Sequence, residues 1–314
     1  MDLIRLKSFL FAAEHLNFSE AAKRLHLTQP TISHHVKVLE HELGVELFDR
    51  SGAKLRLTDA GHLLLPAARD LVRQCGDVKA LVSSLNDKVV GELNIACSTT
   101  AGKYILPLLV ARFCKRYSGI RVNILACTPP HIIPQLLEGE ANLGVISSEI
   151  IGKGTENQLF FKDYITLIAP ADHPWTVRPS IEPEDLLGEP MIIREATSGT
   201  RRMMLAELAQ HDIGLDDLKV LMTLGNTEAI IHTIAAGYGV GFVSQLAAEC
   251  CLQRGKIIEV PIPALNLQRN IYMVRPKSDH SHRAQEVFWG FIHDPENEDL
   301  LRLAEMPTGG NTPI

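Results

Sequence analysis

Hydrogen-bonding side chains that could read nucleic-acid bases gather in residues 28–37 of this 314-residue chain. Glutamine can pair with adenine, serine and threonine can serve several bases or phosphates, and a proline ring can touch a thymine methyl group. Such types lie along the exposed face of a predicted helix, at Gln29, Pro30, Thr31, Ser33, His34 and Lys37. The pattern therefore favours a helix that enters a DNA groove.

Two shorter helices must position this recognition helix. An apolar face at helical spacing predicts the first helix, from Leu6, Phe9, Leu10 and Ala13. We expect Ser19 to be the N-cap of the second helix, in which Ala21-Ala22 permits a close crossing. Thr28 can cap the recognition helix, Pro30 is tolerated in its first turn, and Gly44 can end it. The predicted buried stripe of that helix is formed by Ile32, Val36, Leu39 and Leu43.

A short β-hairpin, or wing, is predicted over residues 45–58. Its basic side chains Arg50, Lys54 and Arg56 suit contact with phosphates or the minor groove. The predicted DNA contacts are completed by residues of the second helix and the following turn, namely Ser19, Lys23 and Thr28. The alternative for residues 1–58 is a generic three-helix domain whose polar face only meets solvent.

A long helix is predicted for residues 59–88. Apolar and small side chains recur along it at alternating spacings of four and three, at Leu64, Ala68, Leu71, Cys75, Val78, Val82 and Leu85. This heptad seam predicts a coiled-coil partner helix and therefore a dimer. In such a dimer the two copies of residues 1–58, here called the head, would meet DNA half-sites about one turn of the double helix apart. The alternative is a core helix of one larger domain.

Residues 89–294 alternate predicted strands and helices, which favours an α/β fold with a parallel sheet between helices. We divide this body into a first lobe, about 89–168 and 265–294, and a second lobe, about 169–264. Residues 295–314 are polar and rich in proline and glycine, so we expect a flexible tail.

Hydroxyls and small amides follow four predicted strands of the body. They are Ser98, Thr99, Thr100, Thr128, Thr197, Ser198, Thr200, Asn226 and Thr227. Ligands of open α/β sheets bind at such strand ends, where helix N-termini attract anions without a metal. These residues are therefore predicted to bind a small anion. Simple N-capping is the alternative at each loop.

These segments resemble a known family. The head resembles the winged helix-turn-helix of LysR-type transcriptional regulators through Leu27-Thr28-Gln29-Pro30, Leu47-Phe48-Asp49-Arg50 and Ala60-Gly61. The body is similar to the effector-binding domain of that family through Ser198-Gly199-Thr200-Arg201 and Gly225-Asn226-Thr227-Glu228. That domain is a two-lobed, type 2 periplasmic-binding-protein-like fold. His34-His35, where arginine or lysine often stands first, and Thr128-Pro129-Pro130-His131 depart from the family pattern.

The resemblance implies a transcriptional regulator that binds double-stranded operator DNA. The effector in its interlobe cleft would be an inorganic anion, a carboxylate or a phosphorylated metabolite. The motifs look closest to the subgroup that controls sulfur assimilation or carbon fixation. The resemblance also implies a homodimer assembling into a homotetramer, RNA polymerase as a partner, and no cofactor.

Composition agrees with a protein that touches DNA locally. The net charge is −6, but residues 1–58 hold eight basic and seven acidic side chains, so the head carries +1 and the remainder −7. No apolar window is long enough for a membrane span, and the N-terminus lacks the pattern of a signal peptide, so we expect a cytoplasmic protein.

Three other functions stay open. Cys97 and Cys127 precede predicted cleft loops, so a redox-sensing regulator of the same fold is one alternative. A solute-binding protein without DNA function is the second. An enzyme is the third, although the sequence offers no Ser/His/Asp order and no phosphate-binding glycine loop with lysine. His280 and His282 are read as a polar loop rather than a metal site.

Overall fold

The computed structural model describes residues 1–51, 55–84, 89–97, 100–147, 154–277 and 283–303, with the backbone alone for residues 73, 77, 79–84, 100, 101 and 303. Contacts between Cα atoms divide the chain into two compact units, Met1–Gly91 and Glu92–Ile314. Each unit has a hydrophobic core of its own.

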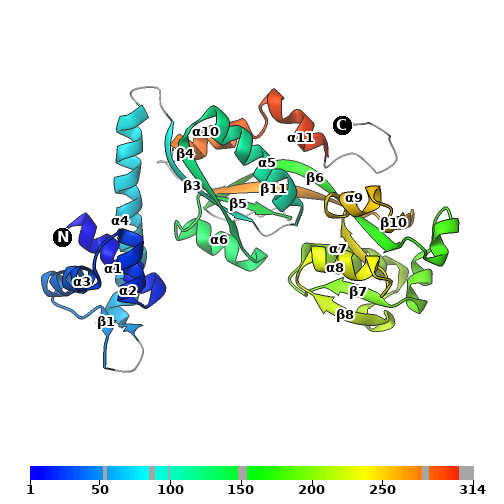
Figure 1. The fold of residues 1–314 in the computed structure, drawn as a ribbon, viewed down its shortest axis with the longest axis horizontal. Coiled ribbons are helices and arrows are strands. Elements are labelled where there is room, and N and C mark those ends of the chain that lie inside the picture. Colours follow the sequence, from blue (N-terminus) through cyan, green and yellow to red (C-terminus); the bar gives the residue numbers. More distant parts are fainter. Residues whose placement is uncertain (52–54, 85–88, 98–99, 148–153, 278–282, 304–314) are drawn as a thin grey trace. The chain divides into compact units, whose positions relative to one another are not determined.

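The first unit is a helical head with a small β-hairpin (Figure 1). Its elements follow in the order α1 (Leu3–His15), α2 (Phe18–Leu25), α3 (Gln29–Leu43), β1 (Phe48–Asp49), β2 (Arg56–Leu57) and α4 (Asp59–Ser84). The rings of Phe9 and Phe18 pack edge-on against Phe48, with centroids 5.7 and 5.3 Å away. These contacts fix β1 to α1 and α2. The predicted helix-turn-helix with a wing is confirmed.

Local chemistry sets both ends of α3 as predicted. The Thr28 hydroxyl accepts a hydrogen bond from the Thr31 amide, and Gly44 ends the helix in a left-handed conformation with φ 71°. Ile32, Val36 and Leu39 are fully buried in the head. Leu43 is 41% exposed, so its predicted burial is wrong, because it is the last helical residue before the chain turns at Gly44.

The N-cap of α2 is Asn17 rather than the predicted Ser19. The Asn17 side chain accepts hydrogen bonds from the amides of Ser19 (2.8 Å) and Glu20 (3.2 Å). The prediction failed because Leu16 adopts a left-handed conformation that ends α1 (φ 47°). The extended backbone before α2 then falls on Asn17.

Replacing Asn17 by alanine should lower the free energy of unfolding of the head by about 1 kcal/mol, because two helix amides lose their acceptor. The neighbouring change Ser19→Ala should alter it by less than about 0.5 kcal/mol, since it leaves the Asn17 cap in place. Native-state hydrogen exchange of the head amides measures both values. Equal losses in the two variants would contradict the capping by Asn17.

The second unit is an α/β body. Its strands are β3 (Val90–Cys97), β4 (Gly119–Ala126), β5 (Leu143–Ile146), β6 (Thr155–Pro170), β7 (Met191–Arg194), β8 (Val220–Leu224), β9 (Gly241–Ser244), β10 (Ile257–Val260) and β11 (Gln268–Pro276). Its α-helices are α5 (Thr100–Arg116), α6 (Pro129–Leu137), α7 (Gly199–Leu208), α8 (Thr227–Ala235), α9 (Gln245–Gln253), α10 (Arg283–Phe291) and α11 (Glu298–Leu303). Short 3₁₀ helices lie at Pro174–Val177, Pro183–Gly188, Ala209–His211, Leu215–Asp217 and Pro295–Asn297.

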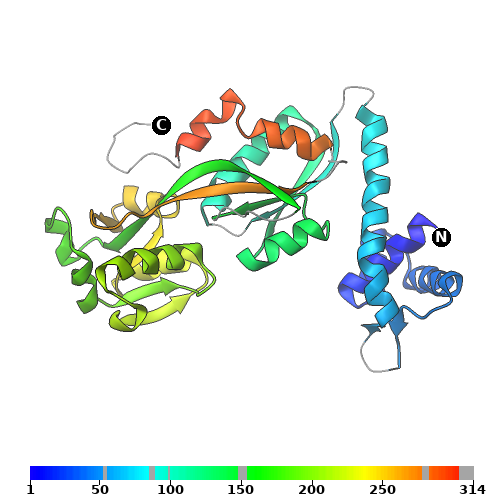
Figure 2. The ribbon, with the colours of Figure 1, turned by 180° about the vertical axis from the view of Figure 1, so that it is seen from behind.

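The main sheet is mixed rather than parallel as predicted. Its strand order is β10-β6-β11-β5-β3-β4, with β9 also paired to β6. Within this sheet β3 and β5 are parallel, but β6 runs antiparallel to β9, β10 and β11. The parallel pair β7–β8 forms a separate two-stranded sheet. Figure 2 shows β6 and β11 side by side, running from one lobe to the other. These two strands are therefore the connection between the lobes.

The segment after residue 294 begins as an ordered structure rather than a flexible tail. Arg112 of α5 makes two hydrogen bonds of 2.7 and 2.6 Å to the Asp299 carboxylate, and Arg116 bonds Asp294 at 2.8 Å. Leu300 of α11 is buried. The polar composition was misleading because the acidic side chains of this segment are held by arginines far away in the sequence. Residues 304–314 lie outside the described part of the chain.

Candidate functional site

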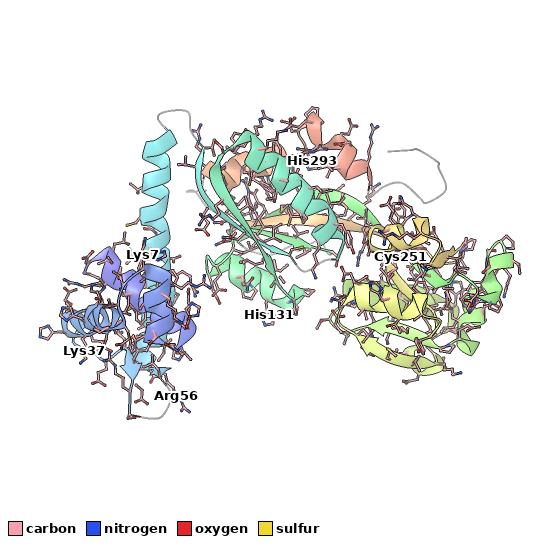
Figure 3. The ribbon with its side chains drawn as sticks, in the orientation of Figure 1. Lys7, Lys37, Arg56, His131, Cys251 and His293 are labelled. Carbon is pink, nitrogen blue, oxygen red and sulfur yellow. The ribbon has the colours of Figure 1, made fainter. Side chains whose placement is uncertain are left out.

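The recognition face of α3 is largely open to solvent. Gln29, Pro30, His34 and Lys37 are exposed, and Thr31 and Ser33 are half-buried. Figure 3 shows Lys37 on α3 and Arg56 near β2 as labelled basic side chains of the head. The structure therefore places the predicted base-reading residues on one accessible helix.

The two histidines that depart from the family pattern differ in environment. The His35 Nδ1 atom lies 2.9 Å from the Ser8 hydroxyl, and Ser8 is completely buried in α1. His35 therefore links α3 to α1, while His34 alone is exposed beside the recognition face.

A carboxylate of α3 organises the wing. Glu40 accepts hydrogen bonds from the amides of Leu47 (3.0 Å) and Phe48 (3.2 Å) and from the Arg50 guanidinium (2.9 Å). The same guanidinium lies 5.3 Å from the centroid of the Phe18 ring. Arg50 thus holds the wing against the helices, a role that sequence reasoning missed, and its contact with DNA stays a prediction. Lys54 lies outside the described residues.

The two predicted contacts on α2 also have local partners. The Lys23 amino group lies 2.6 Å from Glu20 in an exposed i,i+3 ion pair. The Ser19 amide donates to Asn17. Contact of either side chain with DNA stays a prediction, because an exposed ion pair of this kind is weak enough to exchange for a phosphate.

The predicted seam of α4 is divided between two environments. Ala68 is fully buried in the head core, and Leu64 packs against that core. Leu71 is 39% exposed and Val78 59% exposed, with Cys75 also exposed. The first two seam positions therefore serve the head itself, because α4 begins by packing on α1. The Val82 side chain and Leu85 lie outside the described residues.

Two of the predicted effector residues have partners within their own helix, one as an N-cap and one through a side-chain hydrogen bond. The Asn226 side chain accepts a hydrogen bond from the Ala229 amide at 3.0 Å, which is N-capping of α8. The Thr128 hydroxyl lies 2.6 Å from His131 Nδ1 in the first turn of α6. Thr197 is exposed. Ser98 and Thr99 and the side chain of Thr100 lie outside the description.

Thr200 belongs to a buried network that joins both lobes. Its hydroxyl accepts a hydrogen bond from Arg269 Nη1 at 3.2 Å, and Arg269 forms an ion pair with Asp163 at 2.6 Å. The Asp163 carboxylate also accepts from the Ser244 hydroxyl at 2.7 Å. Asp163 is fully buried and the Arg269 side chain is 7% exposed. The network ties the first turn of α7 to the strands β6 and β11.

Ser198, which begins α7, is buried, and the next residue meets the first lobe. A Cβ atom added to Gly199 would lie 2.4 Å from the Ser147 hydroxyl, which follows β5. A side chain at residue 199 would require the Ser147 side chain to move, so the start of α7 lies close to the end of β5. The two lobes approach each other here at strand ends, and the use of this place as a binding cleft stays a prediction.

A second arginine lies at the end of β7. Arg194 makes two hydrogen bonds to the Glu195 carboxylate, at 2.7 and 2.8 Å, and donates to the Thr227 hydroxyl at 2.8 Å. Burial raises the pKa of Glu195, but the hydrogen bonds and charge of Arg194 outweigh it, so the net shift of the pKa is downward. Lys103 of α5 lowers it slightly further. Thr227 is buried, and Glu195 remains ionised beside Arg194.

Another contact bridges the lobes near this pair. The Tyr104 hydroxyl of α5 donates to Glu228 of α8 at 3.1 Å. Burial first, and then the Glu228 charge, raise the pKa of Tyr104 to about 12. Sequence reasoning missed Asp163, Arg269 and Tyr104, because their partners come from distant segments. Arg194 and Glu195 are adjacent in the sequence, but the contact of Arg194 with Thr227 also joins distant segments.

One cavity of the body is lined by other residues. It has a volume of about 280 Å³ and lies between β6 and the segment that joins β10 to β11. Thr166, Glu259 and Leu265 line it, and none of the predicted effector residues does. This cavity therefore does not mark the proposed effector cleft, for which the argument rests on the polar groups at the strand ends.

The described cysteines do not form an activated thiol pair. Cys97 is buried, and Cys127 follows β4 with its amide bonded to the Cys97 carbonyl at 3.1 Å. Burial raises the pKa of the Cys127 thiol and outweighs a backbone hydrogen bond that lowers it. The thiol is therefore protonated and weakly nucleophilic at neutral pH. Cys251, labelled in Figure 3, packs into a hydrophobic cluster.

We expect alkylation of Cys127 by iodoacetamide to be slow at pH 7 and to rise only above about pH 9, since the thiolate is the reactive form. Cys127→Ser should leave any effect of hydrogen peroxide on DNA binding unchanged. Peptide mass spectrometry measures the rates against exposed Cys250. Faster alkylation of Cys127 than of Cys250 at pH 7 would favour the redox alternative.

Among the described residues no group of histidine, cysteine and acidic side chains is arranged to hold a metal, and His280 and His282 lie outside that part. No helix within it is long and apolar enough to cross a membrane.

Two family models match the chain. Residues 3–62 match the bacterial regulatory helix-turn-helix protein of the lysR family, and residues 86–295 match the LysR substrate binding domain. A probable RuBisCO transcriptional regulator of Nostoc is 30% identical over 297 residues, covering 92% of this chain and 88% of the relative. This relative agrees with the carbon-fixation side of the subgroup expected from the motifs.

Solved structures share the fold. Full-length CbnR complexed with its target DNA is 22% identical, covers 93% of this chain and 99% of its own, and has a TM-score of 0.68. The regulatory domain of Synechocystis CcmR in complex with 2-PG is 25% identical, covers 68% of this chain and 98% of its own, and has a TM-score of 0.58. The matching families are regulators and not enzymes. With its head and body both matched, the chain belongs to the LysR family of DNA-binding transcriptional regulators and carries an effector-binding domain.

Proposed function

We propose that a small anion is the effector of this regulator and binds in the cleft where the strand ends of the two lobes face each other. The observation that carries the proposal is a repeated pairing. Thr200 and Thr227 each lie in the first turn of a helix, and the hydroxyl of each accepts a hydrogen bond from an arginine, Arg269 and Arg194 respectively. Helix N-termini and guanidinium groups both favour anions.

The chemical class follows from these donors. Guanidinium edges and hydroxyls suit a carboxylate, a phosphate or sulfate. The relative CcmR was solved with 2-PG bound to its regulatory domain, which supports a carboxylated or phosphorylated metabolite. In this proposal residues 1–58 read DNA, 59–88 pair two copies, and 89–294 bind the effector.

Thermal unfolding of the full chain tests the proposal, because a ligand that binds only the native state raises the unfolding temperature. Sodium sulfate, phosphate and 2-phosphoglycolate are compared with sodium chloride at equal ionic strength. At least one should raise the midpoint, and Thr200→Val and Thr227→Val should reduce the rise. If none of the three raises the midpoint above the chloride control, the proposal fails.

The anion would act by changing the angle between the lobes, and the change would pass through α4 to the spacing of the DNA heads. Footprinting and DNA bending with and without the bound anion test this step. Identical footprints and bend angles in the two states would exclude it.

We also propose that two copies pair through α4, and that dimers assemble into a tetramer that contacts RNA polymerase at the promoter. The exposed apolar side chains Leu71 and Val78 support pairing. Val78→Glu should reduce the mass measured by sedimentation velocity, whereas Gln74→Glu, an exposed polar position on the same helix, serves as the control. An unchanged mass for Val78→Glu would place the interface elsewhere.

A further inference from the structure

The two arginines of the cleft are neutralised in different ways. Arg269 is paired with Asp163, a carboxylate that is fully buried and also bonded to Ser244. Removing that carboxylate from its partner would leave an unpaired charge in the interior. Arg194 is paired with Glu195, whose side chain is 36% exposed. Glu195 can therefore leave its arginine for solvent, while Asp163 cannot.

The geometry of the second pair resembles that of a bound ligand. Glu195 offers two oxygens to the Nε and Nη2 atoms of Arg194, so the carboxylate occupies the whole edge of the guanidinium. The remaining Nη1 atom stays fixed by Thr227 at 2.8 Å. A planar carboxylate or a phosphate can take the same edge with one oxygen opposite each donor, whereas a single halide ion cannot form two parallel hydrogen bonds of this kind.

We propose that Arg194 is the anion receptor of the cleft and that Glu195 is an internal competitor, which an effector carboxylate or phosphate displaces. This inference rests on the proposed function and names the residues that set its affinity and specificity. No covalent bond changes in the exchange. One oxyanion replaces another on the same guanidinium edge, and the released Glu195 carboxylate faces solvent and the positive Lys103 of α5.

Internal competition has a measurable consequence. If the Arg194–Glu195 ion pair is formed about nine-tenths of the time, a ligand that can bind only when the pair is broken binds about tenfold more weakly. Because Glu195 is attached next to its arginine, its effective concentration is high and constant. The cleft therefore rejects weakly binding anions. It responds only to ligands that make further contacts besides those with the guanidinium edge of Arg194, for example with the Thr200 side of the cleft.

Isothermal titration of the full chain with 2-phosphoglycolate and with inorganic phosphate tests the proposal. Glu195→Gln removes the competitor and keeps the side-chain shape, so its affinity for at least one probe should rise about tenfold over wild type. Arg194→Gln should abolish binding. Glu184→Gln is the charge control, because it removes the same charge from an exposed residue outside the proposed cleft. Its affinity should change by less than about twofold, since exposed charges are screened.

The outcomes separate this inference from the proposed function. If wild type and Glu195→Gln bind a probe equally, or Glu184→Gln gains as much, the competitor role of Glu195 is wrong and the anion cleft stands. If neither wild type nor Glu195→Gln binds either probe, both ideas fail. Thermal midpoints without ligand verify folding, and Arg194→Lys, which keeps the charge but not the forked edge, should bind phosphate more weakly than wild type.

Discussion

Replacing Asp163 by asparagine is expected to lower the free energy of unfolding of the second unit by about 3–5 kcal/mol, because the buried Arg269 charge then lacks its partner. The change should be large since the pair joins β6, β11 and α7 at one point. Both tryptophans, Trp175 and Trp289, lie in this unit, so urea unfolding followed by tryptophan fluorescence reports on it selectively.

A matched control comes from an exposed pair in the same unit. Arg178 and Asp185 lie 2.7 Å apart at the surface, and Asp185→Asn should cost less than about 1 kcal/mol. The double variant Asp163→Leu with Arg269→Met removes both charges and should recover most of the stability. If Asp163→Asn is as mild as Asp185→Asn, the network does not hold the lobes as described.

Substituting Gln29 by alanine is expected to weaken binding of the selected operator by about 1–3 kcal/mol per head, and to relax base preference at the position it reads. Lys37→Ala should instead weaken binding to all DNA sequences alike. It should also reduce the slope of the logarithm of affinity against the logarithm of salt concentration by about one per head. In a dimer each effect occurs twice. The difference arises because an amide reads a base edge while an amino group contacts phosphate.

Fluorescence anisotropy at several salt concentrations measures both variants on a duplex that the wild-type protein selects from a randomised library. Lys115→Ala, an exposed lysine at the end of α5, is the charge control and should leave affinity unchanged. Loss of affinity without loss of base preference in Gln29→Ala would move base reading to other residues of α3.

Local signals predicted the elements well. Thr28 and Gly44 bound α3 as predicted, because cap chemistry acts within a few residues. The choice between Asn17 and Ser19 failed, since both are good caps and the left-handed turn at Leu16 decides between them. The ordered segment after residue 294 was missed because its stability comes from Arg112 and not from its own composition.

The site was predictable only in part. Hydroxyls at strand ends predict an anion-binding cleft, and that role stays a prediction, but the arginine partner of Thr200 follows from strand register. Asp163 faces Arg269 across more than a hundred residues of sequence because β6 pairs antiparallel with β11. The same antiparallel pairing of β6 with β11 makes the sheet mixed. The alternation of strands and helices in the sequence does not show in which direction the strands pair. The features that could not be predicted from the sequence are therefore those that depend on pairing between distant strands and not on local propensity.

The single carboxylate of Glu40 fixes how the head must meet its target. By holding the amides of Leu47 and Phe48 together with Arg50, it joins the recognition helix and the wing into one stiff piece. The rigid head then sets the distance between the DNA groove contacted by α3 and the phosphate backbone contacted by the wing. We expect the double helix to do the bending, so operators should be distinguished partly by how easily their uncontacted base steps deform.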